Sequence, residues 1–230
     1  MLLEWLSNPF FWTALAQIIA IDLLLGGDNA VVIAMACRRL PKTLQTKAIY
    51  GGMAGAVAVR VVMLFFALQL LAVPYLKLVG AVLLLWVGIK LAANRDDDAE
   101  DIDGGTRLWT AIKTIIVADV VMSLDNVLAV AGAGNGNLYL VAAGVLISIP
   151  IIVLGSRFVL AVMERFPVVV QAGAALIGWI AGSMASQDLA FFPPLAPLPW
   201  LHWAVSAAGA VLVVLVGKWL GSRKVVAAES

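Results

Sequence analysis

Two pairs of aspartates lie inside long apolar runs of this sequence, and both pairs have the same spacing. They are Asp22 and Asp28 in the first run and Asp119 and Asp125 in the second, and the later aspartate of each pair precedes an asparagine, Asn29 or Asn126. An ionised carboxylate at membrane depth costs at least about 2.5–3.5 kcal/mol, so intramembrane carboxylates usually serve a function. Carboxylate and amide oxygens in this pattern predict a site that binds cations.

The types of ligand narrow the cation to a hard divalent ion. Oxygen ligands suit magnesium, calcium and manganese, whereas zinc and copper favour histidine and cysteine. The single histidine, His202, and the single cysteine, Cys37, are both predicted near helix ends, away from the aspartates. Met122 lies one helical turn from Asp119 and Asp125, where a thioether would favour manganese over calcium or magnesium; core packing is the alternative for this side chain.

The spacing within each pair predicts a break in the helix that carries it. Residues six apart on a continuous helix are separated by about 120° in projection, so Asp22 and Asp28 would point in different directions. Gly26 and Gly27 directly precede Asp28 and favour a kink or an unwound turn, which would free backbone carbonyl oxygens as further ligands. Ser123 holds the place of the first glycine in the second pair, but a leucine replaces the second glycine, so a weaker break is expected there.

Two further polar residues at membrane depth are candidates for accessory roles. Arg60 lies in the middle of another apolar run and needs a counter-charge, for which one of the aspartates is the natural partner. In the second half of the sequence the corresponding position is Val153, so this feature is expected in one half only. Ser148, two residues before Pro150, lies where a proline could open a backbone carbonyl.

Composition assigns these runs to a membrane. The chain has 230 residues, of which 63% are hydrophobic and 13% are charged, with a mean hydropathy of +1.03. Such a chain is far too apolar for a water-soluble domain, and a net charge of +1 gives no indication of nucleic-acid binding. We therefore expect an all-α protein in the lipid bilayer, since unbroken apolar runs do not alternate as the strands of a barrel do.

Seven apolar segments are long enough to cross a bilayer, which takes about 20 residues. The segments are residues 10–37, 48–72, 75–93, 109–133, 138–163, 168–186 and 200–220. Lysine and arginine cluster in the connections after the first, third, fifth and seventh segments. Because cytoplasmic loops collect these residues, we expect the N-terminus outside and the C-terminus in the cytoplasm.

The first three segments repeat as the next three. Aligning FWTALAQIIAIDLLLGGDNAVVIA with LWTAIKTIIVADVVMSLDNVLAVA pairs, at a constant offset, Trp12 with Trp109, Thr13 with Thr110, Ile18 with Ile115, Asp22 with Asp119 and Asp28 with Asp125. An odd number of crossings in each unit makes this an inverted-topology repeat, as in many secondary transporters. We expect a single transmembrane domain over residues 1–230, with repeat 1 at 10–93, a cytoplasmic acidic linker at 94–108, repeat 2 at 109–186 and an extra helix at 200–220.

These motifs resemble those of a known family. The segments DLLLGGDNAVVIAMACRRLP and DVVMSLDNVLAVAGAGNG look like the paired Asp-Asn signatures of the TerC family of integral membrane proteins. The match is close to the YjbE-type branch of that family, and the resemblance extends over essentially the whole chain. The resemblance implies export of manganese from the bacterial cytoplasm across the inner membrane. It also implies that the positions of the metal site are Asp22, Asp28, Asn29, Asp119, Asp125 and Asn126.

The leading hypothesis is a secondary transporter that exports divalent manganese, with a proton counter-flow as an attractive driving force. Accessory roles at the site are assigned to Arg60, Met122, Gly26, Gly27, Ser123 and Ser148. We expect no enzymatic activity and no prosthetic group. The sequence does not specify the oligomeric state, and a homo-oligomer is one alternative.

Three alternatives are weighed against this hypothesis. The exported ion could be calcium or magnesium, because the same ligands suit all three cations. A membrane scaffold for metallation or for the response to tellurium stress is a different class of function. An intramembrane aspartyl protease is disfavoured, because it needs only two carboxylates, whereas four occur here in two copies that each end in Asp-Asn.

Overall fold

The computed structural model describes residues 9–66, 69, 73–93, 104–133, 137–188 and 199–228. Within these ranges it leaves undescribed the side chains of residues 9–10, 125, 127–133, 138, 199 and 223–228. Every regular element among these residues is an α-helix, as the sequence predicted. The helices are α2 (Pro9–Leu25), α3 (Gly27–Cys37), α4 (Lys42–Phe65), α6 (Leu76–Ala93), α7 (Gly104–Ala133), α8 (Leu138–Arg165), α9 (Pro167–Ser186) and α10 (Pro199–Ala228).

Five of these helices are long and apolar enough to cross a membrane, within the part of the chain that the structure describes. They are α4, α6, α8, α9 and α10, and the pair α2 and α3 makes a sixth candidate span that is bent by 48°. The helix at the remaining predicted span is α7, which carries Lys113, Asp119 and Asp125 and is not among the candidates. The chain is therefore a polytopic all-helical membrane protein, and the seventh span stays a prediction.

Several helices extend beyond the apolar segments that predicted them. Helix α4 begins at Lys42 and not at residue 48, and α10 continues to Ala228, beyond residue 220. Helix α7 begins at Gly104, so the predicted linker over 94–108 is wrong for its last five residues, and residues 94–103 lie outside the described part. Hydropathy detects only the part of a helix that lies in the hydrocarbon core, whereas the hydrogen-bonded helix continues into the polar layer.

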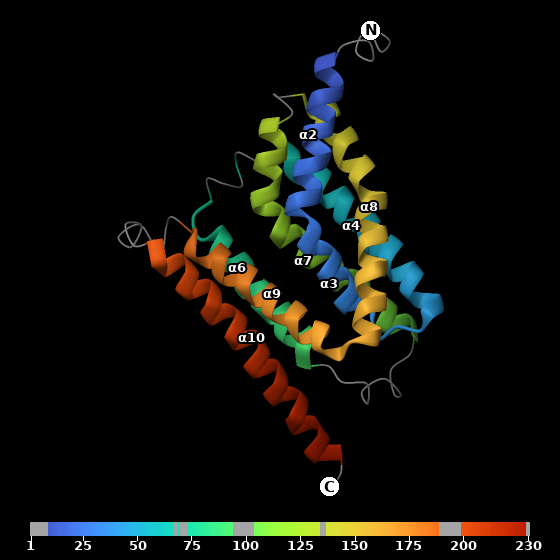
Figure 1. Ribbon diagram of the computed structural model, residues 1–230, viewed down its shortest axis with the longest axis vertical. Coiled ribbons are helices and arrows are strands. Elements are labelled where there is room, and N and C mark those ends of the chain that lie inside the picture. The colour runs from blue at the N-terminus through green and yellow to red at the C-terminus, as the bar shows by residue number, and fades with distance from the viewer. Residues whose placement is uncertain are drawn as a thin grey trace.

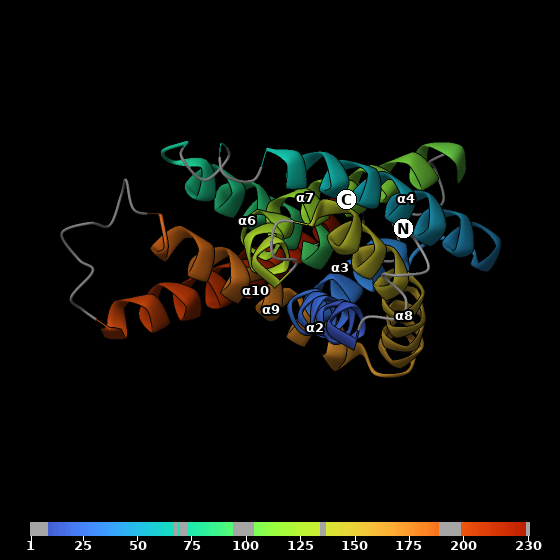
Figure 2. The ribbon, with the colours of Figure 1, turned by 90° about the horizontal axis from the view of Figure 1, so that it is seen from above.

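The helices of the two halves of the sequence are interleaved. Helix α7 packs along α4, while α2 and α3 pack along α8, and α6 packs on α9. Helix α10 lies against α9 and α6 on the flank of the molecule, and α2 begins near one end of the long axis while α10 ends near the other (Figure 1). Seen from above, α9 and α10 extend to one side and α4 and α8 lie on the other (Figure 2). The two halves therefore meet along α2, α3, α4 and α6 of the first half and α7, α8 and α9 of the second.

Close backbone contact fixes α10 on α9. A Cβ atom added at Gly178 would lie 2.3 Å from the carbonyl oxygen of Gly209, and one added at Gly182 would lie 2.3 Å from that of Val205. Small residues at helix interfaces let backbones approach closely and are a common means of association within membranes. Helix α10 is thus held at the periphery, away from the aspartates.

Gly26 separates α2 from α3. Its N–H donates to the carbonyl oxygen of Asp22 at 2.7 Å, and its own carbonyl accepts from the N–H of Asn29 at 3.1 Å, which begins the next helix. The break predicted at the glycine pair is confirmed. The weaker break expected in the second pair is wrong, because α7 is one continuous helix, and Leu124 has a much better helix propensity than glycine.

Candidate cation-binding site

A buried ion-pair network joins the two halves of the chain. Nη1 of Arg60 in α4 donates to Oδ1 of Asp22 in α2 at 2.8 Å, and Nη2 donates to Oδ1 of Asp119 in α7 at 2.6 Å. Arg60 is 5% exposed, Asp22 1% and Asp119 6%, and charges buried so deeply must be paired. The prediction that Arg60 pairs with an aspartate is confirmed, and one guanidinium binds the first aspartate of both pairs.

Three neutral side chains donate further hydrogen bonds to these carboxylates. Ser148 of α8 donates to Oδ2 of Asp22. Ser123 donates to Oδ2 of Asp119 at 3.3 Å, and Nδ2 of Asn29 donates to Oδ1 of the same carboxylate at 3.0 Å. All three donors were singled out from the sequence, and the structure brings them to the network from α3, α7 and α8.

Asp28 lies beside this network and has one oxygen without a partner. It is in the first turn of α3, where the positive end of the helix dipole favours a negative charge. It is within electrostatic range of Asp119 and Arg60. Oδ1 of Asp28 and Oδ1 of Asn29 are buried and accept no hydrogen bond within the described part of the chain. Such acceptors are rare, and both are oxygens of the kind that bind hard cations.

The second Asp-Asn pair is described only in part. Asn126 is buried, and its Nδ2 donates to the carbonyl oxygen of Leu25 at 3.3 Å. Leu25 is the last residue of α2, so the break does present a backbone carbonyl at the site. Leu25 was not among the residues predicted for the site, although its place directly before the glycine pair could have indicated it. The side chain of Asp125 lies outside the described residues, so its predicted role stays a prediction.

The described charges of the site do not balance. Asp22, Asp28 and Asp119 supply three carboxylates and Arg60 one guanidinium, which leaves a formal charge of −2 when all four are ionised. No three His, Cys, Asp or Glu side chains among those described lie close enough together to hold a metal ion. Instead, Arg60 pairs with one oxygen each of Asp22 and Asp119. Asp28 and Asn29 each have a buried side-chain oxygen that accepts no hydrogen bond from the described residues.

The remaining predicted accessory residues are Met122 and the two glycines, Gly26 and Gly27. Met122 is 6% exposed and belongs to the main apolar cluster with Val121 and Ala118, which supports core packing over metal binding. The two glycines differ from each other. A Cβ atom at Gly26 would lie 2.6 Å from the carbonyl oxygen of Asp22, whereas one at Gly27 would meet no atom within 4 Å.

Substituting the two glycines by alanine is expected to have opposite outcomes. Gly26→Ala must displace the Asp22 backbone and should weaken cation binding by at least about tenfold, since groups that orient ligands typically contribute 10–100-fold. Gly27→Ala is the matched control and should leave binding within about twofold. Titration of the two purified variants with manganese checks the difference. Equal affinities would contradict the role assigned to Gly26 in holding the break.

The sequence is similar to known membrane proteins. The family described as Integral membrane protein TerC family matches residues 7–225. The uncharacterized membrane protein YjbE of Bacillus subtilis (strain 168) is 43% identical over 175 residues, which are 76% of this chain and 80% of that protein. The UPF0053 inner membrane protein YgdQ of Escherichia coli (strain K12) is 26% identical over 185 residues, or 73% of this chain and 77% of the relative. No solved structure matches the chain.

Proposed function

The chain belongs to the TerC family of integral membrane proteins, and on that premise we propose that it is a secondary transporter that exports divalent manganese from the cytoplasm. The proposed metal ligands are Asp22, Asp28, Asn29, Asp119, Asp125 and Asn126, with Arg60, Ser123 and Ser148 as their immediate partners. The cation is the substrate of the protein and not a resident cofactor.

The observation that carries the proposal is the unmatched negative charge around Arg60. Three buried or half-buried carboxylates face one guanidinium, and two buried oxygens, one each from Asp28 and Asn29, have no hydrogen-bond donor within the described residues. A divalent cation in the place of Arg60 would reduce the formal negative charge of the site from −2 to −1 and would satisfy both oxygens. A purely structural ion-pair network would be expected to satisfy its own members.

The choice of manganese among hard cations comes from the family resemblance. Carboxylate, amide and carbonyl oxygens serve manganese, calcium and magnesium alike. Met122, which the sequence suggested as a soft ligand that would favour manganese, packs in the apolar core instead. A test of the substrate must therefore compare manganese with calcium and magnesium.

Substrate binding would require Arg60 to release the carboxylates. The oxygens that the guanidinium holds are ligands that a cation needs, and two positive charges cannot share them at contact distance without strong repulsion. Arg60 would thus stabilise the site when it is empty, and the cation would replace it when the site is loaded. The site would then carry a similar charge with and without the substrate. A transporter needs this if it is to return to its starting conformation with an empty site.

The packing of the helices supports alternating access by two inverted units. In the proposed repeat, α2 with α3 corresponds to α7, α4 to α8 and α6 to α9. Helix α7 packs on α4, and the corresponding helices α2 and α3 pack on α8. Helices α6 and α9 pack on each other. The contacts are therefore reciprocal, as a two-fold relation between the repeats requires. Rocking of one unit against the other around a central site is the usual consequence of such an arrangement.

A counter-flow of protons would drive export. Carboxylates must be deprotonated to bind a metal ion, so loading of the site releases protons and unloading takes them up. The predicted orientation, with the N-terminus outside and the C-terminus in the cytoplasm, places the basic connections on the side from which the ion is taken.

Elemental analysis of cells with and without the protein tests the proposal. A strain that lacks it should accumulate severalfold more manganese in manganese-rich medium, with calcium and magnesium unchanged, and the wild-type gene should reverse the effect. A rise in calcium or magnesium instead would reject manganese as the substrate. Normal contents of all three ions would reject export altogether and favour a scaffold for metallation.

A further inference from the structure

Helix α2 has an exposed face that leads to the break beside Asp28. The exposed positions recur every three or four residues, so they lie on one side of the helix. They are Thr13, Ala16, Gln17, Ala20, Leu24 and Gly27. Leu24 is 83% exposed, and a Cβ atom added at Gly27 would meet no atom within 4 Å. The exposed face therefore extends from the beginning of α2, which is the outer end in the predicted orientation, to the aspartate that follows Gly27.

The corresponding face of α7 is covered before it reaches the site. Its exposed residues align with exposed residues of α2 and are Thr110, Lys113 and Val117. Val121, at the position that corresponds to Leu24, is only 4% exposed, because α6 packs on it. A Cβ atom added at Gly80 of α6 would lie 3.1 Å from Cγ1 of Val121. Two positions that are equivalent in the repeat are thus exposed in one half and buried in the other.

The glycine that corresponds to Gly80 in the second repeat makes a different contact. The segments GAVLLLW and GAALIGW align Gly80 with Gly173 of α9. A strictly symmetric molecule would place Leu24 on Gly173. Instead, a Cβ atom added at Gly173 would lie 3.0 Å from Cγ1 of Val31 and 3.0 Å from Sδ of Met35, both in α3. Helix α9 therefore packs about two helical turns beyond Leu24 and leaves that residue uncovered.

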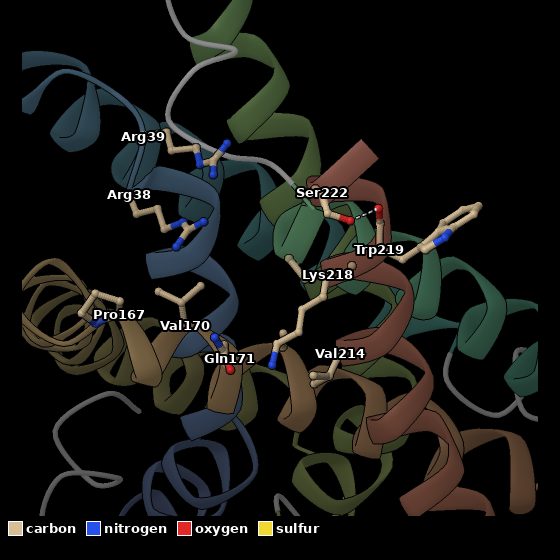
Figure 3. A pocket seen from close by; sticks show the side chains of 13 residues that line it. Arg38, Arg39, Pro167, Val170, Gln171, Val214, Lys218, Trp219 and Ser222 are labelled. Atoms are coloured by element: carbon tan, nitrogen blue, oxygen red, sulfur yellow. Dashed lines mark hydrogen bonds between the residues drawn. The ribbon is translucent and has the colours of Figure 1, made fainter. Parts of the chain in front are cut away.

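The other end of α3 has a cavity that does not reach the site. The cavity has a volume of about 750 Å³ and lies between the ends of α3, α9 and α10 (Figure 3). Its basic lining residues are Arg38, Arg39 and Lys218. Along α3, Val31 and Met35 lie between Asp28 and this cavity, and both pack on α9. The site is thus closed toward the end of α3 and open along α2.

The polar residues on the exposed face of α2 favour contact with water over contact with lipid. Gln17 lies about 12 Å from the beginning of α2, at membrane depth. Its amide makes no hydrogen bond within the described part of the chain, and an unpaired amide in lipid is costly. The corresponding residue of α7 is Thr114, which is buried and donates to the carbonyl oxygen of Thr110 at 2.8 Å. The polar group is paired where the face is covered and unpaired where it is open.

We propose that Leu24 and Val121 are the two gates of the transport path, and that this structure is the state open to the outside. The proposal rests on the proposed export function, because a protein that transports nothing needs no gates. In the opposite state α9 would cover Leu24 through Gly173, and α6 would release Val121 from Gly80. Each repeat would then have the contacts that the other repeat has here, as alternating access in inverted repeats requires.

Cysteine substitution tests which gate is open. In intact cells without manganese, Leu24→Cys and Gly27→Cys should react with a charged, membrane-impermeant methanethiosulfonate added outside. The matched control is Leu154→Cys, since Leu154 is 66% exposed near the middle of α8 and faces lipid. Because the reagent needs water and a thiolate, Leu154→Cys should react at least about tenfold more slowly. The wild-type protein gives the background, since its single cysteine, Cys37, is fully buried.

Inverted membrane vesicles test the closed gate. Val121→Cys should react from the cytoplasmic side no faster than Leu154→Cys, because α6 covers it. Equal rates for Leu24→Cys and Leu154→Cys outside would assign the exposed face of α2 to lipid and overturn the proposal. Reaction of Val121→Cys from the cytoplasmic side as fast as that of Leu24→Cys from outside would also overturn it. If Leu24→Cys does not fold, Gly27→Cys decides.

The labelling is separable from the test of export, because it requires no manganese. Elemental analysis reports whether the protein exports the ion, and the labelling reports which side of the site is open. Fast labelling of Leu24→Cys in a protein that leaves the metal content of cells unchanged would reject both the export and the gates. Manganese export together with slow labelling of Leu24→Cys and Gly27→Cys would reject the gates alone.

Discussion

Arg60→Leu is expected to destabilise the metal-free protein by about 3–5 kcal/mol, the usual cost of removing one partner from a buried ion pair. The guanidinium is the one described side chain that bridges Asp22 and Asp119, so its loss leaves two buried carboxylates facing each other without a counter-charge. The stability of Arg60→Lys should lie between that of Arg60→Leu and that of the wild type, because an ammonium keeps the charge but not the two separated N–H donors. Denaturant or thermal unfolding of the purified proteins measures the effect.

Manganese should rescue Arg60→Leu more than it stabilises the wild type. Ligand that binds only the folded state adds stability in proportion to the logarithm of its concentration over its dissociation constant. Without competition from Arg60, the carboxylates are free to bind the cation. The unfolding midpoint of Arg60→Leu should therefore rise more steeply with manganese concentration than that of the wild type. Arg157→Leu is the control, since Arg157 lies over the Tyr50 ring at 5.4 Å on an exposed face. Equal stabilisation of Arg60→Leu and the wild type would contradict competition for the same ligands.

Asp28→Asn is expected to lower the affinity for manganese by at least about 100-fold, because affinity at oxygen sites depends strongly on the number of charged ligands. Oδ1 of Asp28 is buried without a hydrogen-bond partner among the described residues, so the nearly isosteric amide should leave the fold intact. Manganese titration followed by paramagnetic resonance gives the affinity, and unfolding midpoints verify the fold.

Asp188→Asn is the matched control for this substitution. Asp188 is buried, at 3% exposed, and lies after α9, remote in sequence from the site. Its Oδ2 accepts a hydrogen bond from the N–H of Leu78 at 3.1 Å. Its replacement should affect stability and leave manganese affinity unchanged. The assignment of Asp28 as a ligand would be wrong if both variants bound manganese as tightly as the wild type.

The membrane character, the helical class and the break at Gly26 were predictable from the sequence. Each depends on local properties: apolar length, the cost of a buried charge, and adjacent glycines before Asp28. The pairing of Arg60 with an aspartate was predictable for the same reason, since an intramembrane arginine must find a counter-charge. That both Asp22 and Asp119 share it depends on how α2, α4 and α7 pack together, which no local pattern specifies.

The features that the sequence did not predict arise from packing or from helix ends. The start of α7 at Gly104 lies in a polar stretch that hydropathy cannot distinguish from a linker. The carbonyl of Leu25 became a partner of Asn126 because α2 ends there and α7 passes close by. The cavity around Lys218 brings together residues that are about 180 positions apart, so the sequence indicated its three basic residues only as markers of orientation.

The most direct test of the account is manganese transport by the purified protein in liposomes that contain a manganese-sensitive dye, with calcium and magnesium as competitors. The account predicts saturable manganese flux for the wild type, acceleration by an imposed proton gradient, and flux no greater than that of empty liposomes for Asp28→Asn. Flux through Asp28→Asn equal to that of the wild type, or no flux through a folded wild-type protein under any gradient, would contradict it.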